Sequence, residues 1–428
     1  MEDVFIAQPF TILNHPARRL NKKAQSQYVS ALGVLLGFTS KGNQTVRFVY
    51  ETWISSIFGH VFSPSWSAHD DLSRTEGFNF GAEVQFTPKF LRLLLFDCFY
   101  LNEKAGVITK ELVLERLYGI VGDRCSRDMV DYTYHYFNGQ NNGSKLSVNL
   151  RLHRARSLSF CQQNVKRVLV VATMSAGKST LINALVGEKV NRVKATVCTS
   201  AMRCIFNAQS QYGATMKMGE KLLYTEDAAE MQSGDAKSLA IGFMSSRLAN
   251  RRICIMDTPG VNYSGDLSHG QITRKLIREN KYDLLLFVSN AQQFLINDEL
   301  EVIRFVLKEC KKKLVFVLNQ CDMFSPKDDS IEETLSIFED MIRKEMTRHI
   351  PIVPISGFGA YTIRHAERMG KLIDDDDLFE YEQIKKKFEK AYYNLPSYIS
   401  EKSTGVVEND SILDRTGITI LENIISML

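Results

Sequence analysis

The hydrophobic and polar positions follow two different patterns along the chain, and the pattern changes near residue 165. Before this point apolar residues recur three and four positions apart, which is typical of amphipathic helices. Helices are expected over residues 28–38, 45–58, 90–101 and 112–121. After residue 165, short continuous apolar runs end in polar loops, as in the buried parallel strands of α/β proteins. The pattern therefore predicts an all-α domain followed by an α/β domain.

The helical half has its own core and its own boundary. Trp53, Phe58 and the aromatic cluster of residues 96–100 are expected to fill that core. The two glycines and three asparagines of residues 138–144 indicate a linker. We therefore expect an α-helical accessory domain over residues 1–143.

One apolar run, which starts at Val168, breaks at a loop and resumes as a helical pattern. Phosphate oxygens bind backbone N–H groups at the start of a helix together with a nearby ammonium group. A Gly-Lys-Ser sequence at this position supplies both, and its hydroxyl can ligate Mg²⁺. The residues expected to bind a nucleoside triphosphate here are Ser175, Ala176, Gly177, Lys178, Ser179 and Thr180. Ala172 stands where the usual motif has its first glycine, so its φ angle is expected to be negative.

Three further motifs follow later apolar runs. Asp257-Thr258-Pro259-Gly260 is expected to place a carboxylate near the metal and the Gly260 N–H on the γ-phosphate. In Asn319-Gln320-Cys321-Asp322, the last carboxylate can accept two hydrogen bonds from N1 and N2 of guanine, a donor pair that adenine lacks. A backbone N–H of Ser356-Gly357 is expected to meet guanine O6. Each motif alone is common as a turn. Because open α/β sheets bind ligands where their strands end, the four together predict a GTP site.

The run from Ala172 to Gly187 resembles the phosphate loop of bacterial dynamin-like GTPases, and so do residues 257–264 and 290–293. This resemblance extends over residues 165–428. It implies a P-loop GTPase fold of dynamin type with a mixed, mostly parallel sheet, GTP as substrate and Mg²⁺ as cofactor. The dynamin-type GTPase domain is expected over residues 165–410.

The resemblance also implies roles for individual residues. Lys178 is expected to hold the β- and γ-phosphates. Ser175 would stabilise the transition state or gather a compensating cation. Thr199 is expected to be the switch threonine, with Thr196 as the competing choice. On this basis the catalytic residues are Ser175, Lys178 and Thr199, and the metal site consists of Ser179, Thr199 and Asp257.

Two residues depart from the family pattern. Met174 occupies a position at which animal dynamins have a glutamine that helps to place the attacking water, and a thioether cannot do this. Gln320 replaces a lysine whose alkyl chain packs on guanine. An arginine finger is not assigned, since Arg192 on the expected switch loop is interpreted as a solvated loop residue. These departures keep open a nucleotide-binding scaffold with little hydrolysis. A GTPase assembly factor of the ribosome-associated type, which shares all four motifs, is a further alternative.

The helical domain distantly resembles the tellurite-resistance-B-like domain, whose acidic turn binds metal in some members. The turns at residues 40–42 and 105–106 lack those carboxylates, so no metal is expected here. His60, His69 and His135 have no partner at helical spacing, and they are interpreted as ordinary histidines.

The amino-acid composition of the chain limits the classes of partner and the location that are expected. The 428 residues, 44% hydrophobic and 24% charged, suit a multidomain globular protein. A net charge of +4 does not call for nucleic acid as a partner. The eight cysteines show no Cys-x-x-Cys spacing, and no apolar run is long enough to span a bilayer. A cytoplasmic location is expected. The resemblance adds a nucleotide-dependent homodimer through the GTPase face and a peripheral association with the inner membrane.

Two helices are expected to flank the GTPase domain, one within residues 144–164 and one within 411–428. Their apolar stripes consist of Val148, Leu152, Ala155, Leu158 and Cys161 in the first, and Ile418, Leu421, Ile424, Ile425 and Leu428 in the second. We hypothesise that the two helices pack together as a short neck. In the alternative, each helix covers a different part of the sheet.

Overall fold

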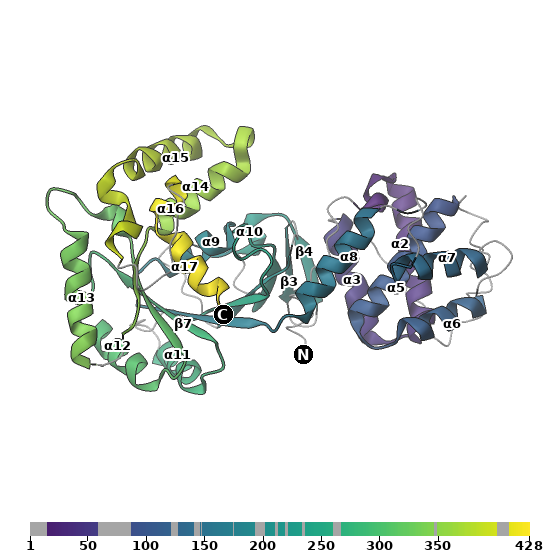
Figure 1. The fold of residues 1–428 in the computed structure, drawn as a ribbon, viewed down its shortest axis with the longest axis horizontal. Coiled ribbons are helices and arrows are strands. Elements are labelled where there is room, and N and C mark those ends of the chain that lie inside the picture. Colours follow the sequence, from purple (N-terminus) through teal and green to yellow (C-terminus); the bar gives the residue numbers. More distant parts are fainter. Residues whose placement is uncertain are drawn as a thin grey trace. The chain divides into compact units, whose positions relative to one another are not determined.

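The computed structural model describes residues 15–58, 87–120, 127–140, 146, 148–173, 175–192, 202–209, 213–218, 221–232, 236–259, 267–345, 349–399 and 411–428. Contacts divide the chain into two compact units. The first contains residues 1–162 with 210–215 and 221–226, and the second contains the rest of the chain (Figure 1).

The first unit is helical, as the hydrophobic pattern predicts. A short turn, η1 (Pro16–Arg19), precedes the helices α2 (Lys22–Ser40), α3 (Gln44–Phe58), α5 (Pro88–Ala105), α6 (Lys110–Ile120), α7 (Arg127–Phe137) and α8 (Val148–Gln162). The four helices expected from the pattern are confirmed as α2, α3, α5 and α6. Helix α5 packs against α2, α3, α6 and α7, so it forms the centre of this unit.

The expected core of the helical unit is confirmed. Trp53, Phe96, Phe99 and Tyr100 are completely buried, and Phe58 is 8% exposed. Helix α7 was not expected, although four of its residues are buried at helical spacing: Val130, Thr133, Tyr136 and Phe137. Tyr136 and Phe137 extend the core next to Phe96 and Phe99.

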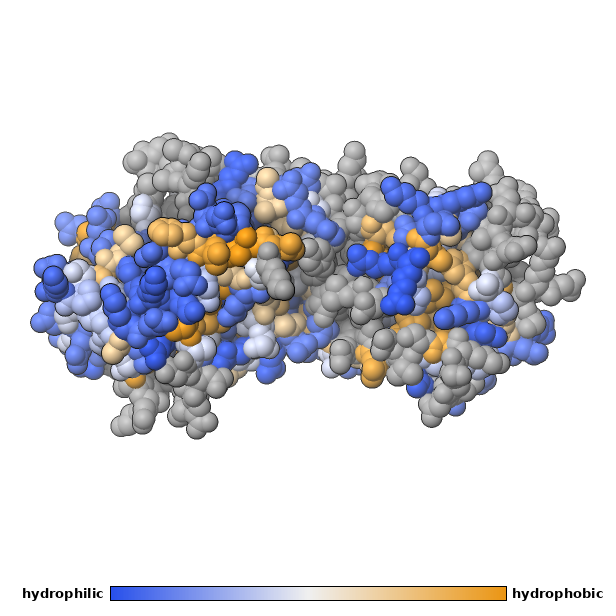
Figure 2. Space-filling model, turned by 90° about the horizontal axis from the view of Figure 1, so that it is seen from above, coloured by the Kyte–Doolittle hydropathy of each residue, from blue (hydrophilic) through white to orange (hydrophobic). Residues whose placement is uncertain are grey.

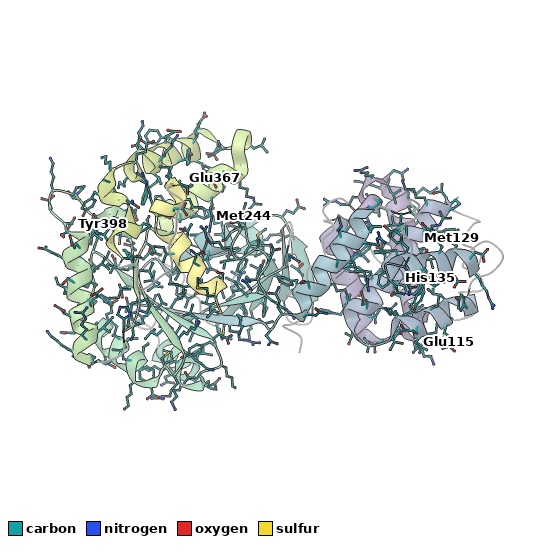
Figure 3. All side chains as sticks on the ribbon, in the orientation of Figure 1. Glu115, Met129, His135, Met244, Glu367 and Tyr398 are labelled. Atoms are coloured by element: carbon teal, nitrogen blue, oxygen red, sulfur yellow. The ribbon has the colours of Figure 1, made fainter. Side chains whose placement is uncertain are left out.

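A buried polar group lies inside this apolar core. The Asp97 carboxylate accepts a hydrogen bond from the Tyr28 hydroxyl and lies 3.0 Å from Nε2 of His15. Since Nδ1 of His15 accepts the backbone N–H of Ala17, Nε2 carries the proton that is shared with Asp97. Burial, followed by the Asp97 charge, raises the pKa of the Tyr28 hydroxyl. The described residues contain no cluster of three or more metal-ligating side chains, and His135 is on the surface of the unit (Figure 3).

Helix α8 presents a different face to this unit than the sequence indicates. Leu152, which the sequence places on the apolar stripe of this helix, is 51% exposed. The two arginines, expected off that face, point toward α7 instead. Arg154 lies 3.8 Å from the Phe137 ring centre and pairs with Glu103, and Arg151 lies over Tyr136. A planar guanidinium can stack on an aromatic ring while it pairs with a carboxylate, which explains the inward arginine face.

The second unit is built on a mixed, mostly parallel sheet, which confirms the predicted fold class, although residues 214–215 and 221–225 of this sheet are assigned to the first unit. Within the described residues the strand order is β4-β3-β5-β2-β6-β1-β7-β8-β9. The strands are β1 (Lys166–Ala172), β2 (Arg203–Asn207), β3 (Ala214–Met218), β4 (Lys221–Thr225), β5 (Ser238–Ile241), β6 (Ile253–Asp257), β7 (Leu284–Asn290), β8 (Lys313–Asn319) and β9 (Ile352–Pro354). Strands β6, β1, β7, β8 and β9 run parallel, whereas β2 pairs with β6 in the antiparallel direction. The carboxyl ends of the parallel strands therefore meet at one edge of the sheet.

Helices cover both faces of the sheet. Figure 1 shows α11 (Leu267–Glu279) and α12 (Asn297–Glu309) on one side, and α14 (Gly357–Met369) and α15 (Asp375–Phe388) on the other. Helix α9 (Lys178–Val186) packs against α14. It ends at Gly187, whose φ is 82° and where an added Cβ would lie 2.5 Å from Cβ of Met244 (Figure 3). Helices α10 (Ala228–Met231) and α13 (Ile331–Glu345) complete the longer connections.

The terminal helices α16 (Ile412–Arg415) and α17 (Ile418–Ser426) belong to the second unit. The apolar residues Ile418, Leu421 and Ile425 of α17 are buried, and α17 contacts α9. Arg364 of α14 forms a buried ion pair with Glu422, 2.5 Å long. The apolar stripe of α17 is therefore covered within the second unit, while its pairing with α8 stays a prediction.

The surface of the second unit is mostly hydrophilic, with apolar side chains interrupting it in one region (Figure 2). Large apolar residues exposed around α15 include Leu372, Leu378 and Phe379. They are set among the carboxylates of residues 374–377 at the start of α15. None of the described helices combines the length and the hydrophobicity that a bilayer span requires.

Candidate nucleotide site

The predicted phosphate loop connects β1 to α9. Helix α9 begins at Lys178, directly after Gly177, whose φ of 76° favours glycine. A Cβ at Gly177 would lie 2.4 Å from Nδ2 of Asn319, so no side chain fits without displacing that residue. Ser175 also has a positive φ, 62°, whereas Ala172 does not, as expected. Ser179 and Thr180 are half-buried in the first turn of α9, where unpaired N–H groups favour an anion.

Lys178 and Asp257 form the electrostatic centre of the site. Strands β1 and β6 are neighbours, which brings the loop after β1 next to Asp257 at the end of β6. The Lys178 ammonium group pairs with Oδ1 of Asp257, and only 11% and 1% of the two side chains are exposed. The hydroxyl of Thr258 donates to the Val170 carbonyl and joins the ends of the two strands. The site thus contains a cation that can move to phosphate and a carboxylate beside it that suits a metal.

The base-reading motif is held against the phosphate loop by Asn319. Its Nδ2 donates to the Ala176 carbonyl over 2.9 Å, and its Oδ1 accepts the Gly357 N–H over 2.9 Å. Gln320 has a φ of 68° and donates from Nε2 to the Ser175 carbonyl over 2.7 Å. The three loops that follow β1, β8 and β9 are therefore fixed to one another.

Asp322, the last residue of this motif, has a buried carboxylate. The residue is 4% exposed, and its Oδ1 is buried without a hydrogen-bond partner in the described part of the chain. An unpaired buried carboxylate oxygen is costly unless a ligand supplies the donor. Nearby, Lys387 donates to the Asp322 carbonyl and so holds the backbone of this turn.

The loop after β9 differs from the expectation. The Ser356 N–H donates to the Thr416 carbonyl over 2.9 Å, and the Gly357 N–H is bound to Asn319. The Ser356 hydroxyl accepts the Gly359 N–H and caps α14. Among the N–H groups at this end of α14, that of Phe358 has no acceptor in the described residues. The N–H without an acceptor in the described residues is thus one residue further along the chain than the expected donors of Ser356-Gly357.

Several expected site residues lie outside the described residues. They are Met174, Thr196, Thr199 and Gly260, together with the expected switch segment except for Arg192. The exposure of Arg192 agrees with its interpretation as a solvated residue.

Two features of the site were missed from the sequence. Glu299, at the start of α12, is completely buried, and its carboxylate accepts the Leu295 N–H over 2.6 Å. It also lies 3.4 Å from the Thr173 hydroxyl, and burial raises the pKa of this carboxyl group. The second feature is Asn191, whose Nδ2 donates to Oδ2 of Asp257 while its Oδ1 accepts a hydrogen bond from Arg203. These polar residues belong to no recognisable motif, so no signal in the sequence could have revealed them.

Comparison with known proteins identifies the type of phosphate-loop domain. Residues 168–321 match the model of the dynamin family. This part of the chain is similar to the dynamin family. The matched span contains the phosphate loop, Asp257 and Asn319, and it ends one residue before Asp322. No curated protein matches the chain.

Solved structures with similarity to the chain include one from a bacterium, one from a bacterial dynamin pair and one from a plant. Era from Aquifex aeolicus, bound to GDP and AlF4⁻, is 23% identical, with 46% of this chain and 52% of Era covered and a TM-score of 0.30. A member of an oligomerised bacterial dynamin pair is 17% identical, with 93% and 62% covered and a TM-score of 0.37. Toc33 from Arabidopsis thaliana, with Mg²⁺ and GMPPNP, is 15% identical, with 64% and 91% covered and a TM-score of 0.32. The chain spans about half of Era's length. The similarity to the dynamin family rests on the match over residues 168–321.

Proposed function

We propose that the protein binds GTP with Mg²⁺, hydrolyses it to GDP and phosphate, and acts as a dynamin-type switch or mechanochemical protein. The main support for guanine as the base is Oδ1 of Asp322, which is buried and has no hydrogen-bond partner among the described residues. The guanine N1–H and N2–H groups are donors of the kind that this oxygen requires. The Phe358 N–H supplies the complementary donor for guanine O6.

On the phosphate side, Lys178 changes its partner. In the structure its ammonium group neutralises Asp257. When phosphate enters, Lys178 turns to the β- and γ-phosphate oxygens, and the Asp257 oxygen that it leaves becomes available for the metal site. Ser179 and Asp257 would hold Mg²⁺ together with Thr199. Bound Mg²⁺ neutralises charge on the phosphate oxygens during transfer.

The protein's contribution to hydrolysis is to position and to stabilise charge. Ser175, with its positive φ, is on the exposed side of the phosphate loop, where a developing charge can be met. Thr199 is proposed to orient the attacking water, since Met174 cannot accept or donate a hydrogen bond strongly. A nucleotide-dependent homodimer through this face, and peripheral contact with a membrane, are part of the same proposal. The flanking neck helices are proposed to transmit the switch movement.

A scaffold that binds GTP with little hydrolysis is the second candidate. The observation that favours it is the hydrogen bond from Gln320 to Ser175, which keeps the Gln320 amide on the phosphate loop. Bound in this way, the side chain does not pack on the base as the family's lysine does. Weak nucleotide retention and slow turnover would follow.

Calorimetric titration of the full chain with GTP, GDP and ATP in the presence of Mg²⁺ tests the binding part of the proposal. We expect binding of GTP and GDP and none of ATP at the same concentrations. The matched variant is Asp322→Ala, which removes the base-reading carboxylate and leaves Lys178 in place. Equal binding of ATP and GTP by the wild type would refute the guanine site.

A further inference from the structure

Asp257 has a second polar partner that belongs to none of the four motifs. Nδ2 of Asn191 donates to Oδ2 of Asp257 over 3.1 Å, while Lys178 pairs with Oδ1. The two oxygens of one buried carboxylate are therefore held by two different residues. Asn191 itself is 6% exposed.

The backbone of Asn191 is fixed from within α9. Oδ1 of Asn183 accepts the N–H groups of Val190 and Asn191 over 3.1 and 2.9 Å. Nδ2 of Asn183 donates to the Asn191 carbonyl over 2.9 Å. Asn191 thus has little freedom to move its side chain away from Asp257.

Arg203 fixes the orientation of the Asn191 amide. Arg203 is directly opposite Asp257 in the antiparallel pairing of β2 with β6, and it is 5% exposed. Its guanidinium donates to the Val190 carbonyl over 2.7 Å and to Oδ1 of Asn191 over 3.2 Å. Since arginine only donates and an ionised carboxylate only accepts, an amide between them can adopt one orientation. Nδ2 of Asn191 must therefore face Asp257.

We propose that Asn191, oriented by Arg203, is a positioning residue that holds Oδ2 of Asp257 so that Oδ1 faces the Mg²⁺ of the bound nucleotide. This inference rests on the proposed function. When Lys178 leaves Asp257 for phosphate, the Asn191 hydrogen bond is the contact that keeps the carboxylate from rotating. Partners of this kind orient metal-binding groups, and their loss typically lowers metal affinity by about 10- to 100-fold.

A purely structural role for Asn191 has different consequences. If the amide only joined the end of α9 to β2, its loss would lower stability and weaken nucleotide binding to the same degree with and without Mg²⁺. If Asn191 positions Asp257, its removal weakens only the Mg²⁺-dependent part of nucleotide binding.

The test measures the affinity of the full-length protein for a non-hydrolysable GTP analogue as a function of Mg²⁺ concentration. We expect Asn191→Ala to keep the affinity for the analogue that is measured without Mg²⁺. The Mg²⁺ concentration that gives half of the maximal gain in affinity should rise by about tenfold. Asn191→Asp is expected to raise it further, because a second carboxylate would face Asp257. Arg203→Lys is expected to act in the same direction, since a lysine retains the charge but not the paired donors to Val190 and Asn191.

The matched control is Asn207→Ala. Asn207 is a buried amide at the other end of β2, and it donates to the carbonyls of Leu248, Ala249 and Arg251. Its loss should lower the melting temperature and leave the Mg²⁺ dependence unchanged. Unaltered Mg²⁺ dependence in Asn191→Ala and Asn191→Asp would overturn the inference, as would an equal loss of affinity without Mg²⁺. A wild type that does not bind the analogue would instead remove the proposed function itself.

Discussion

Replacement of Lys178 by alanine should have two separable effects, one on the nucleotide-free protein and one on binding. In the structure the Lys178 ammonium group is the cationic partner of Asp257, whose side chain is 1% exposed. Among the described residues, Lys178→Ala therefore leaves the Asn191 amide as the hydrogen-bond partner of this buried carboxylate. It also removes the cation that is proposed to hold the β- and γ-phosphates.

The magnitude follows from the burial of the pair. Removal of one partner of a buried ion pair typically costs about 3–5 kcal/mol, because the remaining charge is uncompensated. The Lys178 side chain is 11% exposed, so water can reach its place once it is gone, and we expect the lower end, about 3 kcal/mol. Most of this cost comes from the charge on Asp257. Lys178→Ala/Asp257→Asn should therefore recover about half of it or more, since an amide does not carry that charge.

Denaturant unfolding without nucleotide, followed for the transition of the GTPase unit, measures the first effect in the wild type, Lys178→Ala and the double variant. Lys178→Met, which keeps most of the side-chain volume, is the control for packing. Titration with GTP measures the second effect, and no binding is expected in any of the three variants. A double variant less stable than Lys178→Ala would refute the buried-charge argument. Unchanged GTP affinity in Lys178→Ala would refute the phosphate-loop assignment.

Three other substitutions test separate parts of the account. Asp322→Asn should relax the preference for guanine, because an amide oxygen accepts and an amide nitrogen repels a donor; competition between GTP and xanthosine triphosphate measures it, and an unchanged ratio contradicts the role. Thr199→Ala should slow single-turnover hydrolysis more than it weakens GTP binding; a collapse of GDP affinity would make the residue structural. Asp97→Ala should destabilise the helical unit by about 3 kcal/mol, since it strands the Tyr28 hydroxyl and His15 in the core; thermal unfolding measures this, and a shift no larger than that of the surface variant Asp128→Ala would contradict it.

The strands and the motifs at their ends could be predicted because their signals are local. A continuous apolar run followed by Gly-Lys-Ser or Asp-Thr-Pro-Gly specifies both the element and the chemistry within a few residues. The same holds for the core of the helical unit, where Trp53 and Phe96 are large and apolar.

The missed features depend on partners that are distant in the sequence. The buried face of α8 is set by Glu103 and Phe137, which attract Arg154 inward. The choice of Phe358 over Ser356 as the free donor follows from the bond between Ser356 and Thr416. No periodicity or motif in the sequence encodes such a pairing.

Single-turnover hydrolysis of γ-labelled GTP by the full chain with Mg²⁺ distinguishes a GTPase from a nucleotide-binding scaffold. We expect release of labelled phosphate by the wild type and none above the solvent rate by Lys178→Ala. Labelled ATP should remain intact under the same conditions. Tight GTP binding without phosphate release would contradict the proposed hydrolysis and leave the protein as a nucleotide-binding scaffold.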